Sequence, residues 1–299
     1  MNKDIDNVIL EKKIKEWVTA GEGDFSTGDI DREFDLIEAD EKAFRYKVLE
    51  LMVSFGHIQR VGTRRGWYRR VDRSLNIIDW RGADTKEFDI KLPFSLHEQV
   101  RIFPKSLIVI SGEKNTGKTA FSLNLVKLNQ NRGLPIYYFS SEMLGPEMKV
   151  RLQAFKDVPE ADWNFTPAHR TENFADVIQP DAINIIDFFE IHDKFWLVGK
   201  HMTEIFNRLD SGVAIVCVQK SDSSEHGRGG TFLNEKPRLT INLCKRYNEK
   251  AELDGATMQI TNCKFPRAPY NPNGMMVDYH TYNGSELKPI SGWYLPQKK

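Results

Sequence analysis

One eight-residue segment constrains this 299-residue chain more than any other: Gly112-Glu113-Lys114-Asn115-Thr116-Gly117-Lys118-Thr119, which has the spacing of a phosphate-binding P-loop. It directly follows an apolar run, residues 107–111, and directly precedes a helical pattern, residues 120–129. A loop between a strand and a helix places backbone N–H groups and the positive end of the helix around phosphate oxygens. The sequence therefore predicts a nucleotide site in which residues from Gly112 to Ala120 surround the phosphates.

Three side chains are expected to supply the charge and the metal chemistry of this site. Lys118 would neutralise phosphate oxygens, and the hydroxyl of Thr119 would ligate Mg²⁺. Asp187 ends an apolar run that begins at residue 182, so its carboxylate is placed to hold the hydration shell of the same ion. A strand-end aspartate is also a common turn residue, which is the alternative interpretation.

Two carboxylates compete for the role of orienting or deprotonating an attacking water. Glu142 follows the apolar run 136–140, and Glu190 lies three residues beyond Asp187. Parallel strands direct their carboxyl ends at one crevice, which would bring both side chains near the terminal phosphate. Either glutamate could instead be a helix-cap or surface residue.

Short apolar runs alternate with longer helical segments from residue 106 onward, a pattern typical of a parallel sheet covered on both faces. We therefore expect an α/β core over residues 106–299 with a mostly parallel sheet and a helix near residues 194–209. The predicted strands are residues 107–111, 136–140, 182–186, 213–218, 239–243, 258–262 and 275–279.

The first 73 residues have a different pattern. Three helical segments, near residues 8–18, 28–37 and 40–55, precede two β-like segments, 57–61 and 67–71, joined by a glycine-flanked link. This order predicts a small winged helix-turn-helix domain over residues 1–73. Residues 74–105 contain Pro93 and Pro104 and are expected to form a linker that packs on the core.

Charge is balanced overall, with 42 basic and 42 acidic residues, but it is unevenly distributed. Acidic residues dominate residues 1–56, whereas residues 57–73 contain six arginines and one aspartate. This arginine-rich hairpin predicts a wing that contacts the phosphate backbone of duplex DNA. The acidic second helix is an unfavourable neighbour for DNA, so a protein partner for this domain stays an alternative. The candidate DNA contacts are Arg60, Arg64, Arg65, Arg69 and Arg70 in the hairpin, interleaved with Trp67 and Tyr68, and Lys42, Arg45 and Lys47 on the third helix.

Four segments resemble the core of RecA/DnaB-type ATPases, over about residues 94–293. Tyr138-Phe139-Ser140-Ser141-Glu142-Met143 resembles the stretch that carries their catalytic base, and Ile186-Asp187-Phe188-Phe189-Glu190 resembles their Walker B segment. Val216-Cys217-Val218-Gln219 resembles the strand that ends in a γ-phosphate sensor, and Ile260-Thr261-Asn262-Cys263-Lys264 resembles the late strand with a basic finger. The resemblance implies Glu142 as the base, Gln219 as the sensor, ATP with Mg²⁺, and a homo-oligomeric ring or filament in which the finger acts on a neighbouring subunit.

Three features depart from that family or extend it. Its basic finger has two residues that lie two apart, whereas Lys264 and Arg267 are three apart with Pro266 between them, so either could reach across. The loop after Gln219 contains Lys220 and Arg228, which the resemblance implies as contacts for single-stranded DNA; a solvated surface loop is the alternative. A large helical domain typical of replicative helicases is replaced by the N-terminal domain.

These observations predict a Mg²⁺-dependent ATPase that acts on DNA as a helicase or translocase. An ATP-switched DNA-binding regulator or loader is the main alternative, and a kinase is a weaker one. The motif does not distinguish ATP from other nucleoside triphosphates. No apolar run approaches the ~20 residues of a membrane span, and Cys217, Cys244 and Cys263 have no pairing or zinc spacing, so we expect a cytoplasmic protein with reduced thiols.

Overall fold

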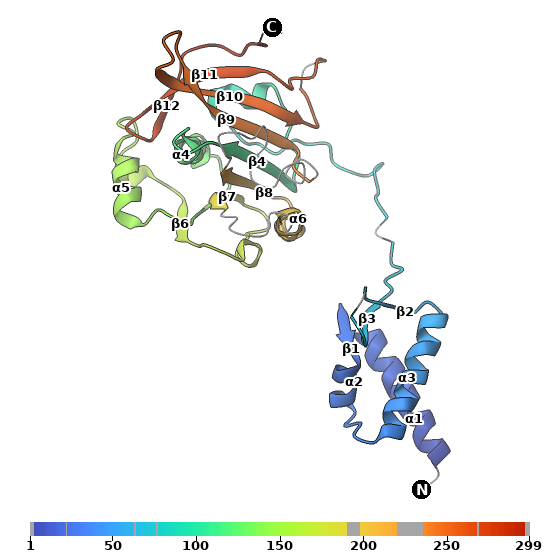
Figure 1. The fold of residues 1–299 in the computed structure, drawn as a ribbon. Coiled ribbons are helices and arrows are strands. Elements are labelled where there is room, and N and C mark those ends of the chain that lie inside the picture. Colours follow the sequence, from blue (N-terminus) through green and yellow to red (C-terminus); the bar gives the residue numbers. More distant parts are fainter. Residues whose placement is uncertain are drawn as a thin grey trace. The chain divides into compact units, whose positions relative to one another are not determined.

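The chain folds into two compact units, residues 1–83 and residues 84–299 (Figure 1). The computed structural model describes residues 3–21, 23–62, 64–75, 77–189, 198–219, 236–267 and 269–296. Each unit contains a hydrophobic cluster of its own, so each is described by itself. Among the described residues, no helix combines the length and the apolarity that crossing a membrane requires.

The N-terminal unit combines three helices with a small antiparallel sheet of order β1-β3-β2. Its elements are α1 (Lys3–Ala20), β1 (Asp24–Ser26), α2 (Thr27–Glu33), α3 (Ala39–Ser54), β2 (Ile58–Arg60) and β3 (Trp67–Arg70). The predicted hairpin is present, because β2 pairs with β3. Strand β1 was not predicted, since three residues beside a glycine-rich break carry no readable alternation; Phe25 of β1 pairs with Tyr68 of β3.

A capping box fixes the start of α2. The side chain of Ser26 accepts a hydrogen bond from the backbone N–H of Asp29 (3.3 Å), and the Asp29 carboxylate accepts one from the backbone N–H of Ser26 (2.7 Å). The helix was expected to reach residue 37 but ends at Glu33. Asp35 adopts a left-handed backbone (φ 53°), which no helix continues through.

Arg45 joins α2 to α3 and corrects one expectation about DNA contacts. Its guanidinium forms two parallel hydrogen bonds with the carboxylate of Asp31, at 3.0 and 2.9 Å, and its side chain is only 9% exposed. Charge-assisted bidentate pairs are strong and geometrically specific. Arg45 therefore holds the two helices together instead of lying on a DNA-facing surface as predicted.

We expect Arg45→Ala to lower the local stability of α3 by about 3 kcal/mol, because it leaves the carboxylate of Asp31 unpaired at a shielded site. Amide hydrogen exchange of residues 39–54 in the whole chain measures this change. Lys47→Ala is the matched control, since Lys47 is an exposed cation on the same helix. Equal protection in the two variants would contradict the structural role of Arg45.

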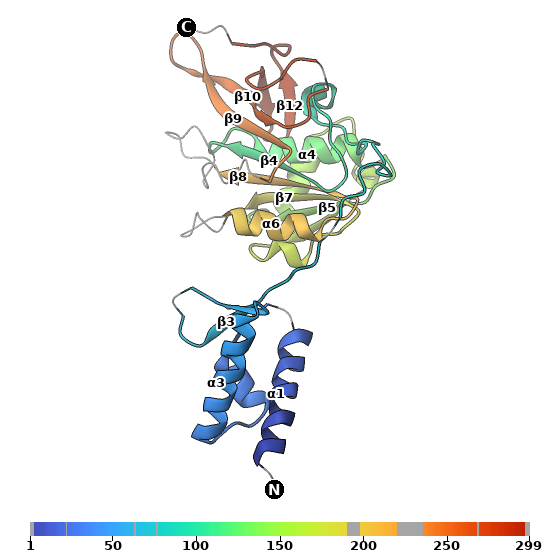
Figure 2. The same ribbon diagram turned by 90° about the vertical axis from the view of Figure 1, so that its right-hand side faces the viewer.

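The second unit is an α/β domain whose described strands form one nine-stranded sheet, of order β12-β11-β10-β9-β4-β8-β7-β5-β6 (Figure 1 and Figure 2). The pairs from β9 to β6 are parallel, and β10, β11 and β12 extend the sheet antiparallel. The mostly parallel sheet confirms the predicted α/β fold, whereas β6 and β12 were not predicted. The strands are β4 (Ser106–Gly112), β5 (Ile136–Ser140), β6 (Thr166–His169), β7 (Ile183–Phe189), β8 (Val213–Gln219), β9 (Leu239–Tyr247), β10 (Leu253–Cys263), β11 (Met276–Tyr282) and β12 (Glu286–Pro289).

Both faces of this sheet are covered, as the near-continuous apolar strands predict. Alternate residues of β4 belong to two different clusters: Ile108 and Ile110 pack in the cluster that contains residues of α4, and Leu107 and Val109 pack in the one that contains residues of α6. The helices are α4 (Lys118–Asn129), α5 (Gly145–Gln153) and α6 (Val198–Arg208), with 3-10 turns at Pro93–Glu98, Glu160–Asp162 and Phe174–Asp176.

Residues 84–105 belong to the second unit and pack into its core. Leu92, Leu96 and Val100 are fully buried in the cluster that contains α4, and the indole N–H of Trp293 donates to the carbonyl of Phe94 (2.8 Å). The apolar side chains of this stretch therefore form part of the core that supports the P-loop helix.

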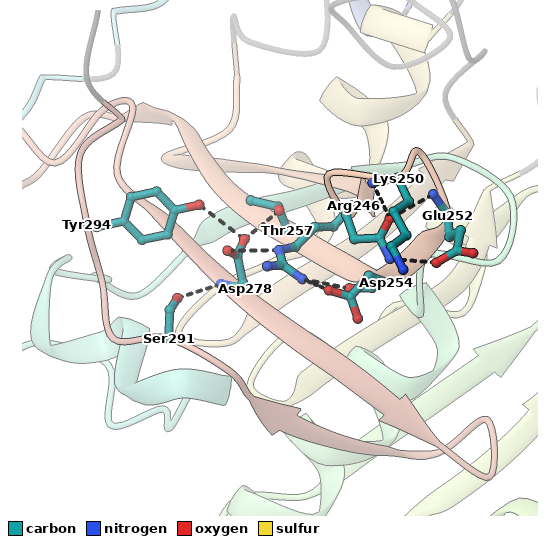
Figure 3. A network of polar contacts seen from close by, with 9 residues as sticks. Arg246, Lys250, Glu252, Asp254, Thr257, Asp278, Ser291 and Tyr294 are labelled. Carbon is teal, nitrogen blue, oxygen red and sulfur yellow. Dashed lines mark hydrogen bonds and ion pairs between the residues drawn. The ribbon is translucent and has the colours of Figure 1, made fainter.

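A polar network connects the antiparallel strands to the C-terminal segment (Figure 3). Arg246 of β9 contacts the carboxylates of Asp254 and Asp278, the latter at 3.2 Å from Nε. Asp278 of β11 also accepts hydrogen bonds from the hydroxyls of Thr257 (2.6 Å) and Tyr294 (3.1 Å). These contacts cross three strands, so β9, β10 and β11 form one connected piece beside the P-loop strand.

Candidate nucleotide site

Local backbone geometry shapes the loop between β4 and α4. Gly117 is the N-cap of α4 with φ of 93°, and Asn115 also has a left-handed backbone (φ 66°). A Cβ on Gly112 would lie 2.8 Å from Oγ1 of Thr116, closer than real Cβ atoms come to other atoms. The motif glycines are thus required by a tight turn that wraps the N-terminus of a helix, a cradle suited to phosphate.

Hydrogen bonds hold this loop in place. Oγ1 of Thr116 donates to the carbonyl of Glu113 (2.9 Å), and the buried hydroxyl of Tyr279 donates to the carbonyl of Thr116 (2.7 Å). The ammonium of Lys118 donates to the carbonyls of Gly112 (3.0 Å) and Glu113 (2.8 Å). Burial lowers the pKa of Lys118, while the charges of Asp187, Glu142 and other neighbours oppose that shift. An anion in the cradle would favour the charged form further.

A pocket of about 440 Å³ opens at this loop. It brings together side chains from the carboxyl ends of three strands, which is the arrangement predicted for parallel strands meeting at one edge. The predicted residues that line it are Lys114, Asn115, Gly117, Lys118, Thr119, Ala120, Glu142, Asp187 and Gln219.

Asp187 of β7 is only 5% exposed at the base of this pocket. Burial raises the pKa of its carboxyl, and hydrogen bonds from Tyr138 and Thr119 and the charge of Lys118 act in the opposite direction. The Thr119 hydroxyl and the Asp187 carboxylate are neighbouring hard oxygen donors. A small set of oxygen donors fits Mg²⁺, which keeps several waters and takes further ligands from phosphates.

Glu142 and Gln219 lie on the pocket wall. Glu142 is an exposed residue between β5 and α5, and Gln219 is half-buried at the end of β8. The competing carboxylate Glu190 lies outside the described residues, as do Lys220 and Arg228. Of the two glutamates considered as the base, Glu142 therefore lines the pocket.

The two basic residues considered as a finger do not line this pocket. Arg267 pairs with the carboxylate of Glu87, and its Nε donates to the carbonyl of His97 (3.1 Å), so it is bound to residues 84–105 of its own chain. Lys264 follows β10, half-buried, with its backbone N–H bonded to the carbonyl of Arg238 (3.0 Å).

Two hairpin arginines point to partners within the N-terminal unit. Arg60 forms an ion pair with Glu50 of α3. Arg70 donates to the carbonyl of Gly23 (3.1 Å) and its guanidinium lies 4.9 Å from the ring centroid of Phe25. Arg70 thus ties β3 to the segment around β1, a structural contact that the charge pattern alone did not indicate.

The remaining hairpin arginines are exposed. Arg64 lies over the ring of Trp67 at 5.6 Å, Arg65 is exposed beside it, and Arg69 of β3 bonds only the neighbouring Gln59 among its described contacts. These three arginines are therefore exposed cations of the hairpin, beside the ion-paired Arg60, whose side chain is 56% exposed.

Sequence reasoning missed one side of the pocket. Arg151 of α5 and Thr281 and Gly284 near the turn between β11 and β12 line it as well. A helix that starts soon after Glu142 was the only available signal for Arg151. No signal pointed to residues 281 and 284, because the antiparallel pairing that places them is long-range.

No family model matches the chain, and no curated protein matches it. Among solved structures, it is similar to a KaiC-like protein from the hyperthermophilic archaeon Pyrococcus horikoshii OT3, with 14% identity, a TM-score of 0.48, and coverage of 69% of this chain and 100% of that one. It is also similar to the RadB recombinase, with 14% identity, a TM-score of 0.45, and coverage of 66% and 94%. At such identities and scores, these likenesses say nothing about what this chain binds or does.

Proposed function

We propose that the chain is a Mg²⁺-dependent ATPase that acts on DNA as a helicase or translocase and works as a homo-oligomer. The observation that carries the proposal is the pocket in which the P-loop residues Lys118 and Thr119 meet Asp187, Glu142 and Gln219. A phosphate cradle, a metal-suited oxygen pair and an exposed carboxylate on one pocket wall are the parts that triphosphate hydrolysis requires.

Each side chain of the pocket has a distinct role in this proposal. Lys118 and the N-terminus of α4 bind phosphate oxygens, and Thr119 and Asp187 hold Mg²⁺, which neutralises phosphate charge when bound. Glu142 orients and deprotonates the attacking water. Gln219 contacts the terminal phosphate from the end of β8.

DNA binding is assigned to two surfaces. The N-terminal unit would act as a winged helix-turn-helix domain that binds duplex DNA through Arg64, Arg65 and Arg69, since phosphate contacts need only exposed cations. Lys220 and Arg228 would contact a single strand in the core. Lys264 or Arg267 of one copy would complete the nucleotide site of the next copy, which makes assembly a requirement for full activity.

A regulator or loader switched by ATP is the second candidate, favoured by one observation. The described residues between 24 and 41 carry exposed carboxylates on and beside α2, such as Glu33, Glu38 and Asp40, a surface suited to a basic protein partner. Such a protein would hydrolyse ATP slowly and would bind duplex DNA in proportion to ATP occupancy.

We expect the triple variant Arg64→Ala, Arg65→Ala, Arg69→Ala to reduce the salt dependence of duplex binding by about 3 in the slope of log K against log salt concentration, one for each lost phosphate contact. Fluorescence anisotropy with a duplex at several salt concentrations measures this slope. Arg32→Ala is the control, because Arg32 is an exposed cation of α2 outside the hairpin. An unchanged slope in the triple variant would exclude the hairpin as a DNA contact.

The test of the function is the steady-state ATPase rate without DNA, with single-stranded DNA and with duplex DNA, under conditions in which light scattering shows the assembly state. Stimulation of about tenfold or more by single strands supports a helicase or translocase. A slow rate that DNA does not change, together with ATP-dependent duplex binding, supports the regulator. The absence of Mg²⁺-nucleotide binding would exclude both.

A further inference from the structure

The helix that follows Glu142 contributes a cation to the pocket, in addition to the lysines of the P-loop. Arg151 lies in the last turn of α5, its side chain is 28% exposed, and it lines the pocket together with Lys118 and Glu142. Its positive charge also acts on Asp187, where it opposes the larger effect of burial on that carboxyl. Arg151 is therefore an electrostatic part of the site, although the catalytic roles proposed above do not use it.

The guanidinium of Arg151 bridges two elements. Its Nη1 donates to the carbonyl of Gly284 (2.7 Å), in the turn between β11 and β12. Its Nε and Nη2 donate to one carboxylate oxygen of Glu147 (3.0 and 2.9 Å), one helical turn earlier. These bonds use three of the five N–H groups of a guanidinium.

The turn is shaped for this contact. Asn283 and Gly284 both have left-handed backbones (φ 51° and 66°), and a Cβ on Gly284 would lie 3.0 Å from Nη1 of Arg151. The same hairpin touches the P-loop helix, because the side-chain amide of Asn124 donates to the carbonyl of Ser285 (2.7 Å). A displacement of Arg151 would therefore also affect the β11–β12 hairpin, which is hydrogen-bonded to α4.

The two bonds of Arg151 to Glu147 are easily exchanged. Glu147 is 53% exposed, and an ion pair between residues four apart on a helix surface contributes little in water. A phosphate group carries more negative charge than the carboxylate of Glu147, and two of its oxygens can accept hydrogen bonds from the planar guanidinium. Arg151 lines the same pocket as Glu142 and Gln219, the two residues proposed to act at the terminal phosphate.

We propose that Arg151 reads the terminal phosphate of the nucleotide bound in its own subunit, exchanging Glu147 for phosphate oxygens while it keeps the carbonyl of Gly284. The triphosphate and diphosphate states then differ at the β11–β12 turn, so the hairpin reports which nucleotide is bound. This inference rests on the proposed nucleotide site and adds a state-dependent contact to it.

Nucleotide affinity tests the inference in the full chain. Competition against a fluorescent ADP gives the dissociation constants of Mg²⁺-ADP and of a non-hydrolysable ATP analogue with an imido β,γ bridge. We expect Arg151→Gln to weaken the analogue about tenfold or more and ADP less than about threefold, as the loss of one charge-assisted contact to a single phosphate group predicts. Arg151→Lys keeps the charge but not the fork and should be intermediate.

Lys149→Gln is the matched control, because Lys149 is an exposed cation of the same helix that pairs with Glu160 and lies outside the pocket. It should change neither affinity. Retained ADP binding in Arg151→Gln shows that the variant is folded, so a selective loss cannot be attributed to misfolding.

A second measurement separates phosphate reading from a structural role. Amide hydrogen exchange of residues 276–289 should differ between the ATP analogue and ADP in the parent protein and should not differ in Arg151→Gln. An equal loss of both nucleotides, or unchanged discrimination, would overturn the inference while leaving the proposed ATPase intact. A parent protein that binds neither nucleotide would instead overturn the proposed function.

Discussion

Replacement of Lys118 by alanine is expected to lower the affinity for Mg²⁺-ATP at least about 100-fold, equivalent to roughly 3 kcal/mol, and to reduce hydrolysis to background. The lysine follows the N-cap of α4, and its ammonium lies in the pocket with Thr119, Glu142 and Asp187. Because the side chain is half-buried and burial lowers its pKa, phosphate binding gains by pairing a cation that is incompletely solvated beforehand.

Isothermal calorimetry with ATP and ADP measures the loss, and thermal unfolding shows whether the loop survives without the two bonds from Lys118 to the carbonyls of Gly112 and Glu113. Lys114→Ala is the control, since it removes an exposed lysine from the same loop and should cost much less. If Lys118→Ala binds ATP within about threefold of the parent protein, the pocket does not bind nucleotide through its P-loop.

The grouping of the candidate site residues in one pocket was predictable because it is determined locally and by one topological rule. The P-loop is contiguous in sequence. Its glycines indicate the left-handed backbone at Gly117 and the close approach of Thr116 to Gly112 that the structure contains. Asp187, Glu142 and Gln219 end or follow apolar runs, and parallel pairing of β5, β7 and β8 brings such ends to one edge. The sequence therefore placed these side chains together without any distance information.

The other wall of the pocket depends on pairings that no local pattern specifies. The β11–β12 turn is placed beside α4 by the antiparallel pairing of β9, β10, β11 and β12. Salt-bridge partners are equally hard to read: Arg45 lies on a helix face like its neighbours but pairs with Asp31, 14 residues earlier. Such contacts are tertiary, so the charge pattern predicted that Arg45 is exposed, whereas its side chain is shielded in the structure.

The burial of residues 84–105 also depends on tertiary contacts that the sequence pattern does not specify. The prolines and mixed composition of this stretch indicated a linker that packs on the core, and in the structure Leu92, Leu96 and Val100 are fully buried there while Phe88 and Phe94 are partly buried. The sequence of this stretch has no helical or alternating period, because its apolar side chains enter the core from an irregular backbone. The composition therefore indicated that the stretch packs on the core, but no pattern indicated which of its side chains are buried.

Replacement of Glu142 by glutamine is expected to lower the hydrolysis rate by about 10²- to 10⁴-fold, the usual contribution of a general base, while ATP affinity stays within a few fold. Glutamine keeps the shape of this exposed side chain on the pocket wall but cannot accept the proton of water. Single-turnover hydrolysis beside equilibrium binding separates the two effects.

Glu160→Gln is the control, because Glu160 is an exposed glutamate away from the pocket that pairs with Lys149, and Glu190→Gln tests the competing base. A rate within about tenfold of the parent protein in Glu142→Gln, with a large loss in Glu190→Gln, would transfer the role to Glu190. A Glu142→Gln protein that holds ATP without cleaving it also distinguishes the two candidate functions. A helicase arrested in this state stops unwinding DNA, whereas an ATP-switched regulator remains in its DNA-bound, partner-recruiting form, since that form depends on ATP occupancy and not on turnover.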